Sequence, residues 1–285
     1  MTAAAPVLPA ARRSLGWWRY TWSQFLLSQK VHWRDLGFAL TGVLIPLGLG
    51  IGLPASQHGK GEVAGIDGGV YLLPGMMGFV LVWIVYNVVN SATSRRGKLI
   101  YKRLRGTPLP DTAIMTGEAM SGSVTSVAQV VVLLVFGLVY LGGPAPANPL
   151  LLLVGVVLGA FTFALLAIGV SGLLPTSEVS TWLVTPFLFL MMFASGIVFP
   201  LSEMPHFLQV PVQYLPSSSV VEILRTAYLG RDFASNPATA QLPREVGFLQ
   251  SFRACVMPLG LLCAWIGVSL GLGKRFFKWD PKRTG

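Results

Sequence analysis

Residues 119–177 read AMSGSVTSVAQVVVLLVFGLVYLGGPAPANPLLLLVGVVLGAFTFALLAIGVSGLLPTS and contain no Asp, Glu, Lys or Arg. A helix crosses the hydrocarbon core of a bilayer in about 20 residues, so this stretch is too long for a single crossing. Its break is the sequence GGPAPANP at residues 142–149, where two glycines and three prolines leave backbone groups that hydrocarbon cannot satisfy. The stretch therefore predicts two membrane-spanning helices joined by a short turn.

The composition of the whole chain extends this prediction. Hydrophobic residues make up 53% of the 285 residues and charged residues 11%, whereas soluble domains carry about 25% charged residues. A charge in the middle of a bilayer costs several kcal/mol, so charge-free stretches mark the candidate spans. We expect an all-α membrane protein with six transmembrane helices near residues 36–54, 70–92, 121–141, 150–172, 181–199 and 252–272.

The distribution of basic residues predicts which side of the membrane each loop faces. With the N-terminus in the cytoplasm, 16 of the 21 Lys and Arg residues fall on the inner side and five on the outer side, as the positive-inside rule requires. Topology thereby accounts for the net charge of +10, and nucleic acid is not expected as a partner. We expect a protein of the cell inner (plasma) membrane with both termini in the cytoplasm.

The chain divides accordingly into four parts. These are a disordered N-terminal tail at 1–13, an interfacial amphipathic helix at 14–34, a six-helix transmembrane domain at 35–273 and a basic cytoplasmic tail at 274–285. A cleaved signal peptide is not expected, because the first apolar run begins only after Arg34 and follows a tryptophan-rich segment.

The segment before the first span carries one apolar helical face. Trp18, Trp22, Phe25 and Leu26 follow one another at i, i+4, i+7 and i+8. Indole rings favour the headgroup region, and basic residues stand at both ends of the segment. This pattern predicts a helix that lies in the cytoplasmic interface and contacts membrane lipid, and the alternative is a simple anchoring collar.

The loop after the second span is strongly basic. It is predicted to form a short helix over about residues 95–106 that stops at Gly106 and Pro108. Ile100 and Leu104 fall on one face of that helix, so we expect a small apolar ridge that projects into the cytoplasm. The alternative is a charged loop that only satisfies the positive-inside rule.

The segment 201–247, between the last two spans, is too long for a turn and too apolar for a free loop. It contains Pro205, Pro211 and Pro216, followed by an amphipathic run at 220–229. Irregular backbone at membrane depth must be packed against protein. We expect a re-entrant outer segment at about 201–247, with a plain outer loop as the alternative.

The sequence contains no recognisable catalytic or metal-binding motif. The histidines are scattered, and the three Gly-Lys pairs are not followed by Ser or Thr as a P-loop requires. Cys255 and Cys263 are expected to be small packing residues, and Asp35, Glu118 and Glu178 to be solvated charges at span edges. We therefore expect no catalytic residue, no metal and no cofactor in this chain, and any energy for transport must come from a partner ATPase.

These features resemble the type-2 ABC exporter permeases, including the daunorubicin-resistance-type drug permeases. Residues 95–110, RRGKLIYKRLRGTPLP, are similar to the family segment R-E-x-G-T-L-x-x-L-R-x-T-P-L. Residues 194–200, ASGIVFP, are similar to its S-G-x-x-F-P block near the outer gate. The chain departs from the pattern at Arg96, where the family often has an acid, and at Lys98, where it has Thr.

The resemblance implies roles for two sets of residues. The residues expected to couple the permease to its ATPase are Arg95, Gly97, Leu99, Ile100, Arg103, Leu104, Arg105, Thr107 and Pro108. The residues expected at the outer gate are Ser195, Gly196, Phe199, Pro200, Pro205, Pro216 and Arg225.

The resemblance also implies a function and partners. The chain is expected to be the permease subunit of an ATP-driven exporter that moves a hydrophobic drug-like or lipid substrate out of the cell. A nucleotide-binding subunit would hold ATP and Mg²⁺, and a second permease copy or a paralogue would complete the pathway. The alternative is an exporter of lipid-linked glycan or polysaccharide. Such an exporter is expected to carry aromatic residues along the channel-facing sides of its spans, and the candidates here are Trp83, Tyr86, Phe161, Phe163 and Phe187. A membrane scaffold or enzyme without transport function is the more distant alternative.

Overall fold

The computed structural model describes residues 16–63, 65–198, 205–235 and 243–277. Within them, helices long and apolar enough to cross a membrane form six candidate spans. These spans are Leu40–Gln57, Gly68–Gly97, Asp111–Val139, Pro149–Ser171, Ser177–Ala194 and Val256–Phe276. The predicted all-α membrane fold with six transmembrane helices is confirmed.

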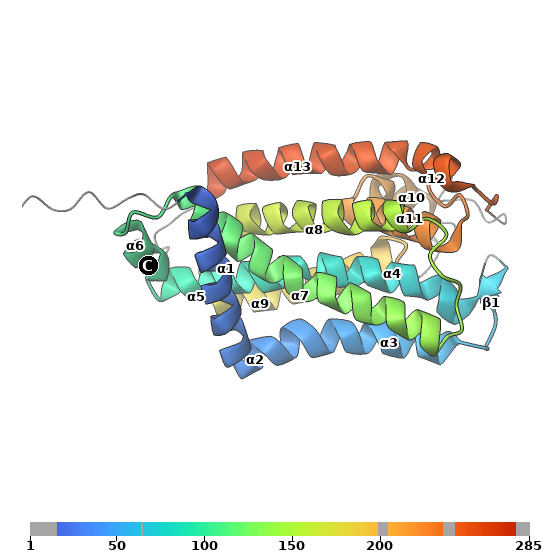
Figure 1. Ribbon diagram of the computed structural model, residues 1–285, viewed down its shortest axis with the longest axis horizontal. Coiled ribbons are helices and arrows are strands. Elements are labelled where there is room, and N and C mark those ends of the chain that lie inside the picture. The colour runs from blue at the N-terminus through green and yellow to red at the C-terminus, as the bar shows by residue number, and fades with distance from the viewer. Residues whose placement is uncertain (1–15, 64, 199–204, 236–242, 278–285) are drawn as a thin grey trace, which may run out of the picture.

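The spans lie side by side along one axis, and one helix crosses them at the end (Figure 1). The elements, in chain order, are α1 (Trp17–Arg34), α2 (Leu36–Ala39), the π-helix η1 (Leu40–Leu44), α3 (Ile45–Gln57), β1 (Glu62–Val63), β2 (Ile66–Asp67), α4 (Gly68–Val82), α5 (Ile84–Gly97), α6 (Ile100–Arg105), α7 (Asp111–Val139), α8 (Pro149–Ser171), α9 (Ser177–Ala194), α10 (His206–Gln213), α11 (Pro216–Leu229), α12 (Phe248–Ala254) and α13 (Val256–Phe276). Strands β1 and β2 form an antiparallel hairpin that pairs Glu62 with Asp67.

The bundle has two distinct ends. The first, here called the α6 end, holds α6 and α1 together with the last turns of α5 and α13 (Figure 1). The second, here called the α11 end, holds β1, α10, α11 and α12. The start of α1 at Trp17 and the end of α13 at Phe276 both lie toward the α6 end.

The predicted hairpin at residues 119–177 corresponds to α7 and α8. Asn148 ends the turn between them, and its side-chain oxygen accepts a hydrogen bond from the Leu151 amide at 3.0 Å. Pro149 follows at the first helical position, where its missing N–H costs nothing. The amide group of Asn148 also donates to the hydroxyl of Ser251 at 2.7 Å, which joins this turn to α12.

The structure corrects several span boundaries. α7 begins at Asp111, ten residues before the predicted start at 121, and α9 ends at Ala194 rather than at 199. The second span continues to Gly97 rather than 92, with an interruption at Trp83 between α4 and α5. The last span begins at Val256, because residues 248–254 form the separate helix α12.

The core of the bundle surrounds the second span, whose residues are buried almost throughout. α11 packs into this core at the α11 end, between α4, α8 and α13. This close contact with α11 requires glycine at three positions of the neighbouring helices. An added Cβ would lie 2.7 Å from Val221 if placed on Gly78, 2.7 Å from Ile223 if placed on Gly155, and 2.9 Å from Val220 if placed on Gly159. Segment 201–247 thus forms helices in its described part, and its re-entrant placement in a membrane stays a prediction.

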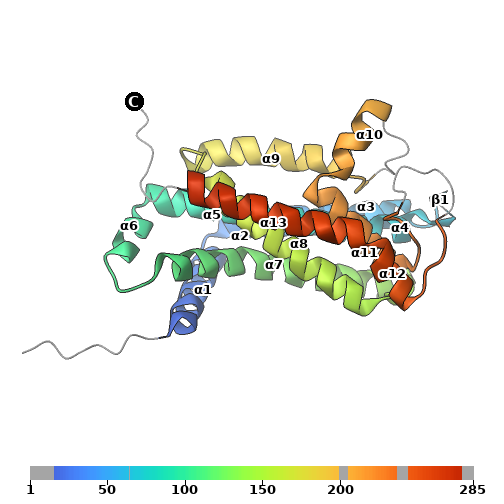
Figure 2. The same cartoon turned by 90° about the horizontal axis from the view of Figure 1, so that it is seen from above.

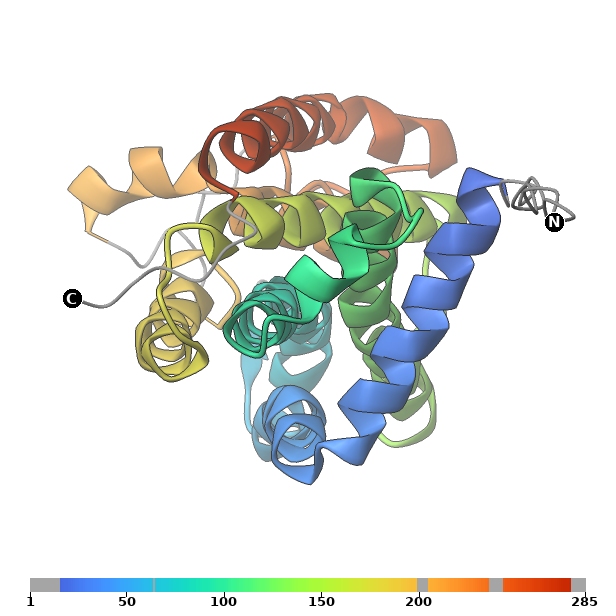
Figure 3. The ribbon, with the colours of Figure 1, turned by 90° about the vertical axis from the view of Figure 1, so that its left-hand side faces the viewer.

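α1 crosses the α6 end of the bundle and packs on α7, as the end-on view shows (Figure 3). The two helices are in close contact at Gly117, where an added Cβ would lie 2.9 Å from the Thr21 carbonyl oxygen and 3.0 Å from the Phe25 amide nitrogen. The view from above places α9 and α10 at one edge of the bundle (Figure 2). α9 packs mainly against α5.

We predict that Gly117→Val detaches α1 from α7. The two backbone atoms of α1 cannot move away independently, so overpacking should lower the free energy of unfolding by about 1–3 kcal/mol. Purified protein should show a lower melting temperature and faster tryptic cleavage within α1. Gly267→Val is the matched control, because an added Cβ at Gly267 meets no atom within 4 Å. Equal cleavage rates in the two variants would contradict this account of the contact.

Candidate functional site

The residues predicted to couple this chain to an ATPase lie at the α6 end. α5 continues through Gly97, so Arg95 and Arg96 belong to the end of the second span and not to a separate basic helix. The chain then turns at Lys98 and Leu99 before α6 begins at Ile100. The prediction of one continuous helix over 95–106 is therefore wrong at its start.

A buried ion pair joins the end of the second span to α7. Nη1 of Arg95 lies 2.9 Å from Oε2 of Glu118, and the two side chains are only 6% and 3% exposed. The hydroxyl of Ser28 on α1 donates to the same oxygen at 3.3 Å, and the hydroxyl of Ser91 on α5 donates to Oε1. The prediction that Glu118 is a solvated charge is wrong, whereas Asp35 and Glu178 are exposed as expected.

Arg96 takes a role that sequence reasoning missed. Its Nη1 donates to the Ser171 carbonyl at 3.0 Å, and its Nη2 donates to the Leu174 carbonyl. These carbonyls lie at and just beyond the end of α8, where helix carbonyl groups lack partners and attract positive charge. The departure from the family pattern at Arg96 thus ties the second span to the end of the fourth.

α6 packs one face against the bundle. Tyr101 is fully buried and forms a small cluster with Ala92 and Ile114, against which Leu104 packs. Burial, together with the negative charge of Glu118, raises the pKa of Tyr101 well above its usual value. The predicted ridge that projects into the cytoplasm is therefore wrong for Leu104, because this side chain faces the protein's own core. Ile100 is half-buried.

The exposed apolar group of this segment is Leu99. Its backbone has φ 57°, in the left-handed region, and its side chain is 42% exposed. A branched side chain in this conformation is uncommon and costs of order 1–3 kcal/mol, a kind of strain that clusters at functional sites. The other exposed members of the predicted coupling set are Gly97, Arg103, Arg105, Thr107 and Pro108. Leu99 and these exposed residues make up an accessible rim, in which Nε of Arg105 lies 3.3 Å from Oδ1 of Asp111.

α1 turns its apolar residues away from the bundle. Trp18, Trp22 and Leu26 are 59%, 46% and 44% exposed, as expected for a stripe that meets lipid. Phe25 departs from the prediction, because it is 9% exposed and faces α7. Polar contacts hold the opposite face, among them a hydrogen bond of 3.1 Å from Gln29 to the Ser121 carbonyl. This inverted arrangement, polar toward protein and apolar outward, suits a helix at a membrane surface.

At the α11 end, Arg225 fixes the turn that follows α9. Its Nη2 donates to the carbonyls of Gly196 and Ile197 at 3.1 and 3.4 Å, and its guanidinium lies 4.1 Å from the centre of the Tyr71 ring. Gly196 adopts φ 71°, and an added Cβ at Gly75 on α4 would lie 2.4 Å from the Ile197 carbonyl oxygen. Arg225 is 5% exposed, so it is a structural anchor of this turn and not a surface charge.

The remaining predicted outer-gate residues are distributed around this turn. The hydroxyl of Ser195 is hydrogen-bonded to that of Ser217 on α11. Pro216 is buried at the first position of α11, and Pro205 is exposed at the start of α10. Phe199 and Pro200 lie outside the described residues. Glu222 lies one turn of α11 beyond Ser219, and burial raises the pKa of its carboxyl to about 8.

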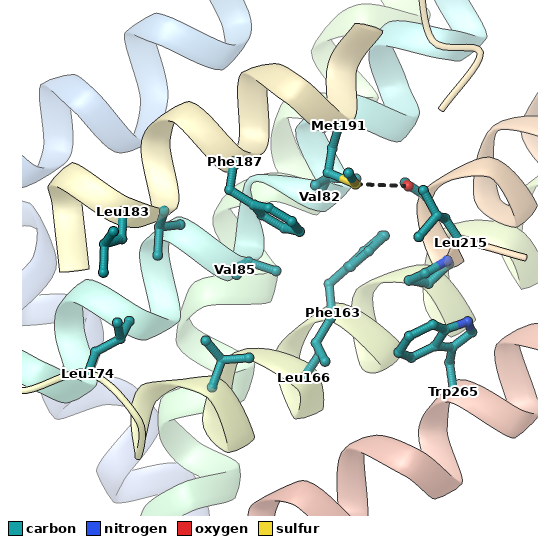
Figure 4. Close-up of a pocket in the computed structure, with 14 residues that line it drawn as sticks. Val82, Val85, Phe163, Leu166, Leu174, Leu183, Phe187, Met191, Leu215 and Trp265 are labelled. Carbon is teal, nitrogen blue, oxygen red and sulfur yellow. Dashed lines mark hydrogen bonds between the residues drawn. The ribbon is translucent and has the colours of Figure 1, made fainter. Parts of the chain in front are cut away.

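An apolar cavity of about 370 Å³ separates α9 from α8 and α13. Figure 4 shows Phe163, Phe187 and Trp265 pointing into it from three different helices. Sequence reasoning missed this cavity, because its walls are ordinary apolar residues of the spans. In the described part of the chain, no group of three or more His, Cys, Asp or Glu side chains is placed to hold a metal ion.

Comparison with known proteins gives two matches. Residues 17–229 match the family described as ABC-2 type transporter. The chain is also 30% identical to Nodulation protein J from Sinorhizobium fredii (strain NBRC 101917 / NGR234) over 187 residues, which cover 65% of this chain and 70% of that protein. The family match runs from α1 through α11, so it includes the residues around the Arg95–Glu118 ion pair and those around Arg225.

We predict that the Arg95 and Glu118 side chains depend on each other for stability. Glu118→Leu leaves a buried guanidinium without its charged partner, and such a loss typically costs about 3–5 kcal/mol. The double variant Arg95→Met with Glu118→Leu removes both charges and should recover most of that loss. Melting temperatures of the wild type, both single variants and the double variant form the test. Additive losses in the double variant would show that the two side chains do not stabilise each other.

Proposed function

This chain belongs to the ABC-2 type transporter family, and we propose that it is the membrane-spanning subunit of an ATP-driven exporter. A separate nucleotide-binding subunit would hold ATP and Mg²⁺, because the sequence lacks a P-loop. The observation that carries this proposal is the construction of the α6 end. An accessible rim around Leu99 is joined directly to a buried ion pair that connects α1, α5 and α7.

In this proposal, the rim enters a cleft of the ATPase. Leu99 supplies an apolar contact, and Arg103 and Arg105 supply charge around it. When the ATPase subunits close on ATP, they displace α6 relative to the membrane. The displacement reaches α5 through its short connection at Lys98 and reaches α7 through Arg95 and Glu118. A packed and charged connection moves as a unit, since its separation would leave a buried charge without a partner.

The proposed orientation places the α6 end in the cytoplasm of a cell with this protein in its inner membrane. The basic residues of α6, of the end of α5 and of the end of α13 gather there, as the positive-inside rule favours. α1 then lies across the bundle at the level of the headgroups, with its exposed tryptophans toward lipid. Both ends of the described chain face the cytoplasm in this arrangement.

A second permease copy or a paralogue is proposed to complete the transport pathway. α9 packs mainly on α5 and leaves large apolar side chains outward, with Trp182 80% and Leu190 60% exposed. Lipid covers such residues in a lone subunit, and a partner subunit replaces lipid in an assembly. The cargo proposed from the family resemblance is a hydrophobic drug-like molecule or a lipid.

An exporter of lipid-linked glycan or polysaccharide is the second candidate, and the positions of five aromatic residues help to evaluate it. Trp83, Tyr86 and Phe163 are 1%, 6% and 2% exposed within one subunit, whereas Phe161 and Phe187 are about half exposed on different helices. These rings do not form one accessible row in a single protomer, which favours the apolar cargo. Stimulation of ATP hydrolysis in the reconstituted complex by lipid or by glycan-linked lipid distinguishes the two candidates.

The proposed orientation predicts the accessibility of single cysteines. Lys60 lies between α3 and β1 at the α11 end, and Lys102 lies on α6, and both side chains are exposed. In a Cys263→Ser background, Lys60→Cys should react with a membrane-impermeant thiol reagent in intact cells and Lys102→Cys only after lysis. Cys255 is fully buried and needs no replacement. Labelling of position 102 in sealed cells would reverse the orientation.

The proposed coupling role predicts a specific defect in Leu99→Asp. A charge placed in an apolar contact with the ATPase costs several kcal/mol, and a loss of about 3 kcal/mol weakens association more than a hundredfold. The variant should insert at normal levels but fail to co-purify with its ATPase. Leu173→Asp is the matched control, because Leu173 is 46% exposed at the same end outside α6.

Leu104→Asp cannot serve this purpose, because Leu104 packs against Tyr101 and its replacement perturbs the subunit itself. Wild-type ATPase association and substrate-stimulated hydrolysis in Leu99→Asp would show that this rim is not the coupling element.

A further inference from the structure

The cavity between α8, α9 and α13 is a partly open apolar slot with a defined direction. It extends from Leu174, beyond the end of α8, to Ser217, at the start of α11. Along α9 it is lined from Leu183 to Met191, which corresponds to about 12 Å at about 1.5 Å per residue. Its long direction therefore follows the spans, and so runs across the membrane rather than in its plane.

The few polar groups at the cavity are already satisfied by the protein. Nε1 of Trp265 donates to the Tyr214 carbonyl at 2.8 Å, which leaves the apolar ring to the cavity. The hydroxyl of Ser217 is hydrogen-bonded to Ser195 and lies 3.9 Å from the sulfur of Met191, a contact drawn in Figure 4. None of the described residues that line the cavity is charged. The occupant that fits these walls is a hydrocarbon without polar groups.

The cavity can be reached from the side of the bundle. Leu183 and Phe187 line it and are nevertheless 57% and 51% exposed, whereas Phe163 on the opposite wall is 2% exposed. The outer wall is thus formed by α9, which packs on α5 and not closely on α13. For a single subunit with six membrane spans, the medium outside this wall is the hydrocarbon of the bilayer.

The size of the cavity suits a small apolar ligand. Its volume of about 370 Å³ lies within the usual range of about 300–1,000 Å³ for small-ligand sites. We propose that this cavity binds one acyl chain of a bilayer phospholipid, which enters sideways between α9 and α13. The rest of that lipid stays in the surrounding bilayer.

Photo-crosslinking tests the proposal on the full chain without ATPase or cargo. The purified protein is placed in nanodiscs of phosphatidylcholine that carries a diazirine in one acyl chain, and the adducts are mapped by mass spectrometry. We expect adducts on the inner wall at Phe163 and Leu166, in addition to outward residues such as Phe161, which is 53% exposed. Adducts confined to outward residues in folded protein would overturn the proposal.

A blocking variant supplies the matched comparison. Leu166→Trp fills the cavity, and adducts on Phe163 should fall by about tenfold or more, a change that corresponds to about 1.4 kcal/mol. Phe161→Trp, on the outward face of the same helix, should leave Phe163 labelling unchanged. If Leu166→Trp does not fold, Leu183→Trp blocks the other wall. Undiminished Phe163 labelling in a folded blocking variant would refute the assignment.

Two further outcomes separate other occupants from a bilayer lipid. A second copy seated over the opening would abolish inner-wall adducts and allow Leu183→Cys to form a disulfide between copies. A drug-like hydrophobic competitor that removes the Phe163 adducts would assign the cavity to cargo, and persistence of the adducts supports lipid. These measurements use no ATPase, so they stand or fall independently of the proposed export function.

Discussion

The carboxylate of Glu118 is the group on which the arrangement of the α6 end depends. An ionised carboxylate away from water requires charge and hydrogen-bond partners. Here they come from Arg95 and Ser91 on α5 and from Ser28 on α1. One buried anion thereby joins α1, α5 and α7 at this end of the bundle. α6 follows α5 after two residues, so its position depends on the same group.

At the α11 end, backbone carbonyl groups provide hydrogen-bond partners for a buried charged side chain. The buried guanidinium of Arg225 donates to the carbonyls of a turn that glycine at position 196 makes possible, and Gly75 lets α4 approach that turn. Burial lowers the pKa of Arg225, but the carbonyls and the Tyr71 ring compensate the cation. Each end therefore contains a buried arginine: Arg95 belongs to the second span, and Arg225 contacts Tyr71 of that span, so α4 and α5 connect the two ends.

The six spans could be predicted from the sequence because each contains a charge-free length close to that needed to cross the bilayer. The break at residues 142–149 could be predicted as well, because its two glycines and three prolines interrupt helices locally. The start of α7 could not be, because Glu118 ends a charge-free stretch unless its partners are known, and Ser28 lies 90 residues away. The prediction of which side chains of α6 face outward was wrong for another reason. Helical periodicity carries no information on the left-handed turn at Leu99, which directs Leu104 inward.

The position of α9 connects the two ends and the cavity. α9 packs mainly on α5, and α5 ends in Arg95 and Arg96, which hold α7 and the end of α8. A displacement of α6 would therefore reach α9 through α5 and the end of α8 through Arg96, and both helices line the cavity. Because α9 packs mainly on α5 and little on α13, whatever fills the slot also affects how freely α9 can move. A deformable hydrocarbon chain fills space without fixing a geometry, whereas interlocked side chains would hold α9 in one place. The apolar slot thus suits a helix that must remain free to move in its membrane.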